Sequence, residues 1–298
     1  MFRTMLAVFH VCLAALFMSL ASACLAQGSL GALGDEFNDP RTMQNWSRLY
    51  QTETGMVDHM ESIDIGATQA GFLTMRPLSS VWYMQYRGEL TYKLVSGDFV
   101  VTTEMHVSNR ARTGAPTASF SLGGLMIRAP RNVPPPAGQP DGENYLFLSV
   151  GSADSPGNFQ LEMKTTTNNN SVYDLLDAGA GEGTLQVARI GDVYILLGRP
   201  TGGQWYVLAR YWRNDLPSTL QVGMTSYTDW DSCRVMEPAV HDATRITWGH
   251  PDLEVGFDFV RFQRPVVPSE FANRDLSDTQ SVSDDELLQF LGDNGMPH

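Results

Sequence analysis

Short runs in which apolar and polar residues alternate follow one another from residue 35 to residue 264, separated by glycine, proline, asparagine or aspartate. This two-residue period is typical of β-strands with one buried face. The 3.6-residue period of a helix is almost absent here. Many short strands without helices predict an all-β sandwich or barrel built as one large domain. The predicted strands are 71–77, 98–108, 123–129, 144–151, 158–167, 184–191, 192–198, 204–212, 220–227 and 255–263.

The same alternation sorts several strands into an apolar face and a charged face, because successive side chains point to opposite sides. The apolar face of 98–108 is predicted to be core. Two interpretations of the charged face remain open: it is the solvated back of a sandwich, or it is a concave groove. In a groove, Glu104 and Glu162 would be an acid/base pair for hydrolysis or lyase chemistry, and His106 a further candidate base. The charged set is Glu104, His106, Arg128, Glu162 and Lys164.

The predicted hairpin 189–212 is rich in aromatic residues on both faces. Trp205 and the residues that alternate with it are expected to be core. On the other face, Tyr206, Arg210 and Trp212 suit a saccharide platform, because sugars stack their C–H faces on aromatic rings while polar groups bind the hydroxyls. Arg128 and Lys164 are further candidate ligand-binding residues. The alternative is that Trp212 packs beneath the long loop 229–254.

The net charge of −13 argues against one class of partner. The 20 basic residues include only two lysines, Lys93 and Lys164, and form no basic stripe. A nucleic-acid-binding protein needs such a stripe to displace counterions from the phosphates. We therefore expect no nucleic-acid partner.

The first 26 residues are predicted to be a signal peptide, with Arg3 followed by an apolar run and small residues up to Ala26. The mature chain would then begin at Gln27 and be secreted or periplasmic. An alternative is a lipoprotein signal with Cys24 acylated. The apolar run is short for a membrane-spanning helix, so no span is expected. Only Cys233 remains after cleavage, which excludes an internal disulfide and favours a buried thiol.

The C-terminal tail, residues 265–298, differs in composition from the body. Its seven acidic residues against the single Arg274 give a net charge of −6, and Ser283 and Glu286 form a capping box for a short amphipathic helix. The tail is either a flexible acidic segment whose helix docks on the body, or a contact for a protein partner. The proline-rich loop 129–144 and the loop 229–254 are long enough to carry specificity.

Four segments, taken in order, resemble the concanavalin A-like lectin/glucanase superfamily. They are DEFNDPRTMQNW (35–46), GDFVVTTEMHV with GGLMIRA, LQVARIGDVYILLGRPTGGQWYVLA, and FDFVRFQ (257–263). The resemblance implies a jelly-roll sandwich of two curved antiparallel sheets over residues 27–264. The third segment is similar to accessory or uncharacterised modules of this superfamily that accompany carbohydrate-active proteins.

The two ends of the body also resemble family 16 glycoside hydrolases. That resemblance implies a structural calcium with Glu36 and Asp258 as ligands, and calcium prefers oxygen ligands of this kind. The alternative is that Asp35 and Asp258 pair with arginines or cap turns. If chelation leaves the melting temperature unchanged, the calcium prediction is wrong, since a ligand bound only by the native state stabilises it. The catalytic carboxylate series of the family is missing, and Glu61 and Asp64 fall on opposite faces of a strand.

The sequence therefore favours a secreted, non-catalytic carbohydrate-binding or extracellular interaction module whose partner is a polysaccharide or glycan. One alternative is a polysaccharide hydrolase or lyase acting on the concave face. A third is a structural envelope protein whose segment 265–298 contacts another protein.

Overall fold

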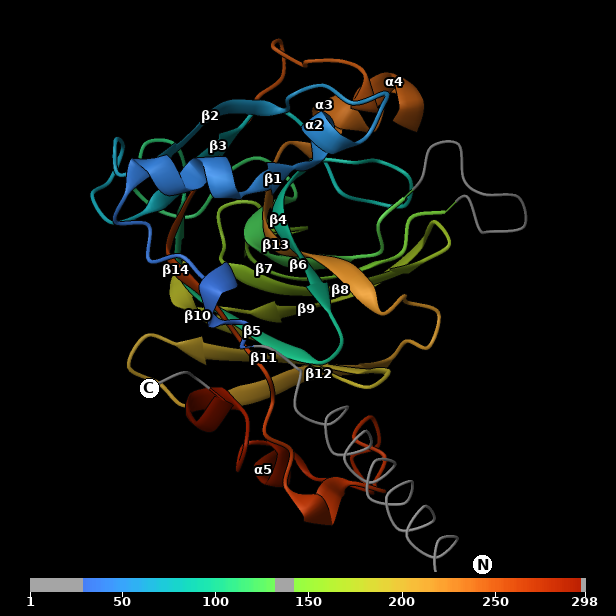
Figure 1. The fold of residues 1–298 in the computed structure, drawn as a ribbon. Helices are drawn as coiled ribbons and strands as arrows, with labels where there is room; N and C mark the ends of the chain where they lie inside the picture. The colour runs from blue at the N-terminus through green and yellow to red at the C-terminus, as the bar shows by residue number, and fades with distance from the viewer. Residues whose placement is uncertain (1–28, 132–141, 296–298) are drawn as a thin grey trace, which may run out of the picture. The chain divides into compact units, whose positions relative to one another are not determined.

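The computed structural model describes residues 29–131 and 142–295. The fold described here belongs to the unit Gly31–His298. That unit is an antiparallel β-sandwich of two seven-stranded sheets, which confirms the predicted all-β jelly roll (Figure 1). Sheet I has the order β1-β4-β13-β6-β7-β8-β9, and sheet II has the order β12-β11-β10-β5-β14-β3-β2.

The strands of sheet I are β1 (Ser47–Arg48), β4 (Glu89–Ser96), β13 (Thr219–Tyr227), β6 (Ser121–Arg128), β7 (Tyr145–Ser152), β8 (Gln160–Thr167) and β9 (Asn170–Asp177). Those of sheet II are β12 (Tyr206–Trp212), β11 (Val193–Pro200), β10 (Glu182–Ile190), β5 (Phe99–Ser108), β14 (Glu254–Gln263), β3 (Leu73–Pro77) and β2 (Met60–Ile65). The helices are short: α2 (Leu49–Thr52), α3 (Trp230–Cys233), α4 (Pro238–Asp242), α5 (Asp284–Leu287), and the 3-10 turns Gly31–Leu33, Pro40–Asn45, Ser269–Phe271 and Gly292–Gly295.

All ten predicted strands are present, and the predicted set lacks the other four strands of the two sheets, β1, β2, β4 and β9. Strand β9 is an edge strand that pairs only with β8 and is mostly exposed, so it lacks a buried face and the alternation that such a face imposes. A β-carbon on Gly123 of β6 would meet the side chain of Val255 in β14, which shows that this face of β6 points toward sheet II. Leu125 and Ile127 share that inner face, and both are buried.

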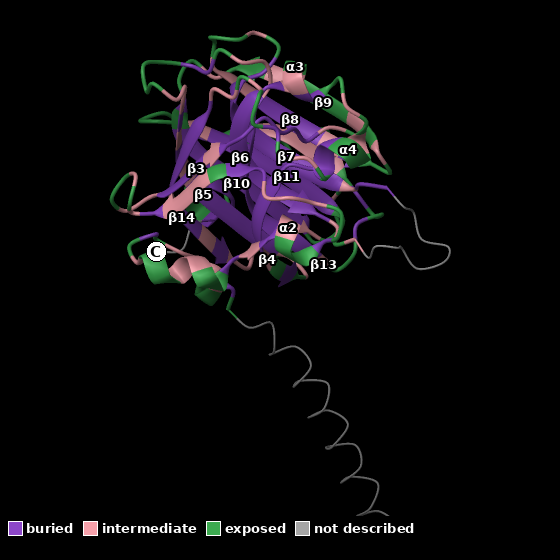
Figure 2. Cartoon of the chain, turned by 90° about the horizontal axis from the view of Figure 1, so that it is seen from above, coloured by how far each residue is buried: buried purple, intermediate pink, exposed green. Residues whose placement is uncertain are grey.

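The predicted core face of β5 is confirmed, because Val101, Thr103, Met105 and Val107 are all buried. Most strand residues of both sheets are buried, as the purple strands of Figure 2 show. Burial extends to the outer faces, which means that other segments cover both sheets from outside.

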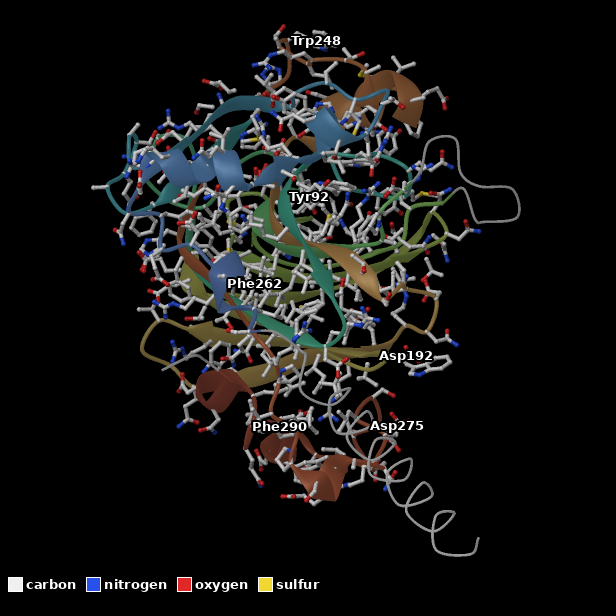
Figure 3. The ribbon with its side chains drawn as sticks, in the orientation of Figure 1. Tyr92, Asp192, Trp248, Phe262, Asp275 and Phe290 are labelled. Atoms are coloured by element: carbon white, nitrogen blue, oxygen red, sulfur yellow. The ribbon has the colours of Figure 1, made fainter. Side chains whose placement is uncertain are left out.

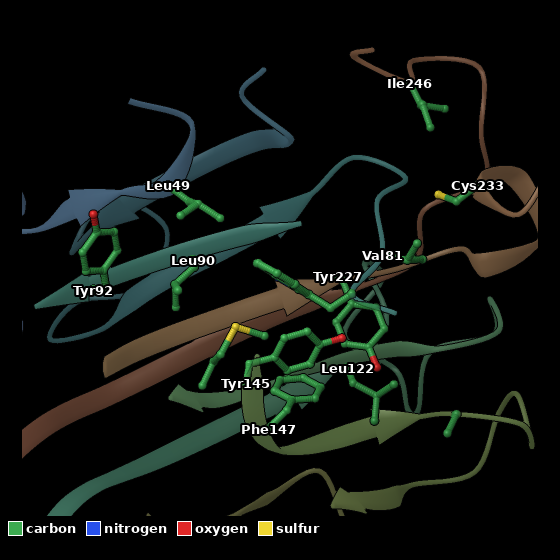
Figure 4. Close-up of a cluster of buried hydrophobic side chains, with 13 residues drawn as sticks. Leu49, Val81, Leu90, Tyr92, Leu122, Tyr145, Phe147, Tyr227, Cys233 and Ile246 are labelled. Atoms are coloured by element: carbon green, nitrogen blue, oxygen red, sulfur yellow. The ribbon is translucent and has the colours of Figure 1, made fainter. Parts of the chain in front are cut away.

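The outer face of sheet I is covered by the segments 78–88 and 229–254. An isolated bridge between Ser80 and Thr228 joins the first segment to the end of β13. Figure 4 shows the resulting second core, in which Tyr145, Phe147 and Tyr227 of the sheet lie side by side, with Val81 and Cys233 of the covering segments nearby. The buried thiol predicted for Cys233 is present, and burial raises its pKa.

The outer face of sheet II is covered by the C-terminal tail. This agrees with the alternative in which the helix of the tail docks on the body. Helix α5 lies beside β11 and β12, on the opposite side of the sheets from α3 and α4 (Figure 1). The predicted capping box is present, since Ser283 accepts from the Glu286 amide and Glu286 accepts from the Ser283 amide. Figure 3 shows Phe290 of the tail and Trp248 of the loop 229–254 on opposite sides of the molecule.

The predicted signal peptide, 1–26, and Cys24 lie outside the described residues. Among the residues that the structure describes, no helix has both the length and the apolar character needed to cross a membrane.

Candidate functional site

A cavity of about 230 Å³ opens on the outer face of sheet I, between the sheet and its two covering segments. Six of its eight lining residues are aromatic, and the only charged one is Lys164. We call it the aromatic pocket. Its lining is Val81, Trp82, Tyr83, Phe120, Lys164, Tyr173, Tyr227 and Trp230.

The floor of the aromatic pocket is a buried ion pair between neighbours on strand β8. The Lys164 Nζ lies 2.9 Å from the Glu162 Oε1 and donates to the Trp82 carbonyl at 2.9 Å and to the Tyr227 hydroxyl at 3.1 Å. The Tyr227 hydroxyl in turn donates to the Glu162 Oε2 at 2.5 Å. Lys164 thus has two hydrogen bonds and one ion-pair contact, and both Lys164 and Glu162 are buried.

Burial decides the protonation of this floor. It lowers the pKa of Lys164, although Glu162 opposes the shift, and together with Glu162 it raises the pKa of the Tyr227 hydroxyl well above its ordinary value. Tyr227 therefore keeps its proton and acts as a donor to Glu162. It has no tendency to serve as a general base at neutral pH.

The walls are partly exposed aromatic rings from the loops and the edge strand β9. Tyr83 and Trp230 meet edge to face at 5.5 Å between ring centroids, and Phe120 and Tyr173 do so at 5.9 Å. The Tyr83 and Tyr173 hydroxyls and the Trp230 indole N–H make no hydrogen bond with any residue in the described ranges. Each is thus a polar group at the edge of an aromatic surface, ready for a ligand.

Unusual backbone conformations surround the aromatic pocket. Met84, Phe120 and Asp229 have φ values of 53°, 48° and 70°, in the left-handed region that non-glycine residues rarely adopt. Such strain costs about 1–3 kcal/mol per residue and often marks ligand-binding positions. At Asp229 the strain is offset locally, because its carboxylate caps α3 through the Ser232 amide and accepts from the Ser79 hydroxyl at 2.6 Å. This cap fixes the start of α3 and with it the position of Trp230.

Arg128 is not available to a ligand, which corrects its prediction as a binding residue. It is fully buried and pairs with Glu53 at 2.6 Å and with Glu143 at 2.7 Å. Glu53 also pairs with Arg87, which reaches Asp242 of α4 at 2.6 Å. We call these five residues the buried charge network. It ties α2, the segment 78–88, α4 and the end of the loop 129–144 to strand β6, and so holds the segments that cover sheet I.

A stacked histidine pair lies beside this network, with His59 and His241 rings 5.1 Å apart. His241 donates to Asp242 through Nδ1 and accepts from the Val81 amide through Nε2. Neither ring nitrogen of the buried His59 has a hydrogen-bond partner among the described residues. Burial, reinforced by His241, lowers the pKa of His59 to about 3.

We expect this histidine to make the protein acid-labile. Between about pH 6.5 and pH 3 the unfolded chain binds a proton at His59 that the folded chain does not. Stability therefore falls as the pH falls through this window, by about 1.4 kcal/mol per pH unit at its centre. Urea unfolding of the wild type and of His59→Phe at pH 7, 6, 5 and 4 checks this. The variant should show the shallower pH dependence, and equal slopes would contradict the assignment.

Glu104 and Glu162 do not form an acid/base pair, which corrects that prediction. Glu162 is on the outer face of sheet I. Glu104 and His106 share the outer face of sheet II with Val100, which contacts the C-terminal tail. Packed sheets are about 10 Å apart, so the two carboxylates lie on opposite sides of the sandwich. His106 is half-exposed and faces Glu182 at 3.5 Å.

The saccharide platform predicted on β12 is also incorrect in its geometry. The register of β12 shifts at a bulge, so that Tyr206 pairs with Gly198 but Arg210 pairs with Ile195. These two partners on β11 are three residues apart, so they point to opposite faces of the sheet. Because paired residues point to the same face, Tyr206 lies on the opposite face from Arg210 and Trp212. Arg210 moreover donates to two carbonyls of the C-terminal tail, at Leu276 and Val282. Tyr206 and Trp212 are exposed, on different faces.

The residues at the proposed calcium site do not fit the ion as they stand. Both carboxylate oxygens of Glu36 accept from Arg261, each at 2.7 Å, and Asp258 is the extra residue at a bulge in β14. The carboxylate of Asp35 accepts from the Phe37 amide and the Trp46 indole. The described residues contain no group of three or more His, Cys, Asp or Glu side chains able to hold a metal. Calcium would have to displace Arg261, and its binding stays a prediction for the chelation test.

The residues that form the aromatic pocket were missed, apart from Lys164. Their signal was present in the aromatic-rich loop segment 81–86, in Tyr227 and Trp230 at and just beyond the end of β13, and in Phe120 and Tyr173. Loop residues have no period that assigns them to a face, so only the fold brings them together.

No protein-family model and no curated protein matches this chain. Among solved structures it is similar to a functionally unknown protein from Saccharomyces cerevisiae, with 14% sequence identity, a TM-score of 0.51, and coverage of 76% of this chain and 99% of that one. It is also similar to the GH43 protein BlXynB from Bacillus licheniformis, with 11% identity, a TM-score of 0.51, and coverage of 78% of this chain. The match covers only 39% of the length of BlXynB. At such identities the likeness concerns the fold alone.

Proposed function

We propose that this chain, which has the concanavalin A-like lectin/glucanase fold, is a non-catalytic carbohydrate-binding module whose ligand enters the aromatic pocket. The observation that carries the proposal is a cavity walled by Tyr83, Phe120, Tyr173 and Trp230. Sugars stack their apolar C–H faces on such rings, and the unpaired hydroxyl and indole groups at the ring edges are placed to bind sugar hydroxyls.

The size of the aromatic pocket favours a small part of a glycan. Its volume of about 230 Å³ is below the roughly 300–1,000 Å³ typical of pockets for drug-sized ligands. One sugar ring, as the end of a chain or a side branch, matches this volume better than a bound oligosaccharide does. The net charge of −13 further favours a neutral over an acidic glycan.

The chemistry of the floor argues against hydrolysis or elimination. Glycoside hydrolysis by the usual mechanism needs two carboxyl groups on either side of the scissile bond, and the lining of the aromatic pocket contains none. Glu162 lies behind Lys164 and Tyr227 and is engaged by both. We therefore assign Lys164 and Glu162 to holding the floor rigid. The export pattern of residues 1–26 supports a secreted or periplasmic location.

We expect Trp230→Ala and Tyr173→Ala each to weaken glycan binding by about tenfold or more, because truncated aromatic anchors typically cost at least 1–2 kcal/mol. Screening the purified protein on a glycan array, followed by calorimetric titration of the hits, measures this effect. The same incubations should release no reducing or unsaturated ends.

Two variants serve as matched controls. Trp248→Ala removes an exposed tryptophan from the same loop as Trp230, outside the aromatic pocket, and Trp212→Ala removes one from β12. Both should bind glycan as the wild type does. Binding that survives Trp230→Ala but is lost in Trp212→Ala would move the site to β12, and the absence of binding to any glycan would refute the proposal.

A further inference from the structure

A second cavity lies inside the sandwich, at the end where β9 and β12 are the edge strands. Its volume is about 370 Å³, and its lining comes from the inner faces of both sheets. We call it the inter-sheet slot. From sheet I it receives Val150, Leu161 and Leu176, which are cross-strand partners on β7, β8 and β9. From sheet II it receives Leu185, Gly198, Tyr206 and Leu208.

The inter-sheet slot is a region of the core that this chain leaves unfilled. Gly198 occupies an inner-facing position between Leu185 and Tyr206, and its absent β-carbon would point at Leu208. Protein interiors are normally close-packed, with few voids larger than a water molecule. An open apolar cavity of this size therefore calls for an apolar occupant, because water gains few hydrogen bonds from such walls.

The exposure of the lining shows where an occupant enters. Leu185 and Val150 are buried deep in the slot, whereas Leu176 and Tyr206 at its mouth are 47% and 57% exposed. Apolar side chains of this size on opposing edge strands leave a continuous apolar path from solvent to the interior. A cavity between two packed sheets, which lie about 10 Å apart, suits a linear chain better than a globular group.

Charged groups at the mouth select the head of that chain. Asp177 and Glu182 border the slot, and the one basic residue in its lining, Arg199, is already paired with Asp293 at 2.7 Å. An anionic head group, such as a free fatty-acid carboxylate, would be repelled. An uncharged polar head would meet acceptors that can receive its hydroxyl hydrogens.

We propose that the inter-sheet slot binds a single aliphatic chain that carries an uncharged polar head, as in a long-chain alcohol or a monoacylglycerol. This site is separate from the aromatic pocket, which lies on the outer face of sheet I. It gives the protein a lipid-binding activity that does not depend on glycan binding.

Calorimetric titration with 1-hexanol, 1-octanol and 1-decanol tests the proposal. The dissociation constant should fall about fourfold with each methylene that enters the slot and level off once the slot is full. Decanoate should bind more weakly than 1-decanol at low salt, and 1 M salt should narrow the difference. No saturable binding, no dependence on chain length, or tighter binding of decanoate would each overturn the proposal.

A pair of variants on one strand locates the site. Leu176→Trp places a bulky ring across the mouth and should weaken 1-decanol binding at least tenfold. Val172→Trp adds the same ring on the same face of β9, four residues away and outside the slot lining, and should leave binding unchanged. Equal effects of the two variants would overturn the assignment. Trp230→Ala should bind 1-decanol normally, which separates failure here from failure of the glycan proposal.

Discussion

Replacing Arg128 with methionine is expected to lower the free energy of unfolding by about 3–5 kcal/mol, since breaking a buried ion pair from one side leaves uncompensated charge. Arg128 is fully buried between Glu53 and Glu143. Burial tends to raise the pKa of Glu143, but Arg128 and Arg131 more than offset this and hold it below its ordinary value. Without the guanidinium, two carboxylates must share a desolvated site with less positive charge or take up protons.

The size of this effect is large against the total stability of a domain, which is about 5–15 kcal/mol. Urea unfolding followed by tryptophan fluorescence measures it. Arg128→Lys should be intermediate, because lysine keeps the charge but not the two-sided guanidinium geometry.

A matched control is Arg41→Met. Arg41 pairs with Asp39 at the surface, where its side chain is 85% exposed, and solvent screening leaves such pairs little effect on stability. If Arg128→Met unfolds within about 1 kcal/mol of the wild type, the buried charge network does not hold the covering segments as we infer. The same variant should also weaken glycan binding, because Arg87 and Asp242 connect the network to the segments that carry Tyr83 and Trp230.

The sequence predicted the sandwich well because the core strands carry an apolar inner face, although the covering segments bury much of their outer faces too. Val101, Thr103 and Met105 alternate regularly, and such alternation has few physical explanations other than a half-buried strand. Strand β9 was not predicted because it has no buried apolar face. Val172, Tyr173 and Leu176 are all exposed, so no face of this strand is marked by a consistent apolar period.

The candidate site was predicted less well, for two physical reasons. The outer face of sheet I is charged yet buried, and alternation alone does not distinguish a solvated face from one roofed by loops, as at Arg128 and Lys164. In addition, a single-residue bulge reverses every side chain beyond it. That bulge separates Tyr206 from Arg210, and nothing in the residue pattern of 204–212 reveals it.

In the C-terminal tail, the residues that predict the helix are not the residues that determine where the helix docks. Ser283 and Glu286 predicted the helix from adjacent residues alone. Where the helix docks depends on an apolar stripe of sheet II that includes Val193, Ile195 and Leu197. With its apolar side chains on this stripe, the tail presents mainly acidic residues outward, which limits the partner-binding alternative to partners with basic surfaces.

Replacing Leu287 with alanine is expected to destabilise the docked tail by about 2–5 kcal/mol, the usual cost of removing a fully buried leucine. Leu287 is completely buried against sheet II, together with Phe290 and Leu291. This loss should appear first as local opening of α5 and the residues around it. Limited proteolysis should then cut within residues 265–295 faster than in the wild type.

Leu288→Ala is the matched control, since Leu288 is the adjacent leucine and only partly buried. Its effect should be clearly smaller, and equal proteolysis of the two variants would show that α5 does not dock as described.

Truncation after Arg264 removes the tail altogether and exposes the apolar stripe of sheet II. Exposed apolar patches of that kind drive association. Sedimentation should therefore show self-association of the truncated protein and none of the full chain, and a monomeric truncated protein would mean that the stripe finds another cover.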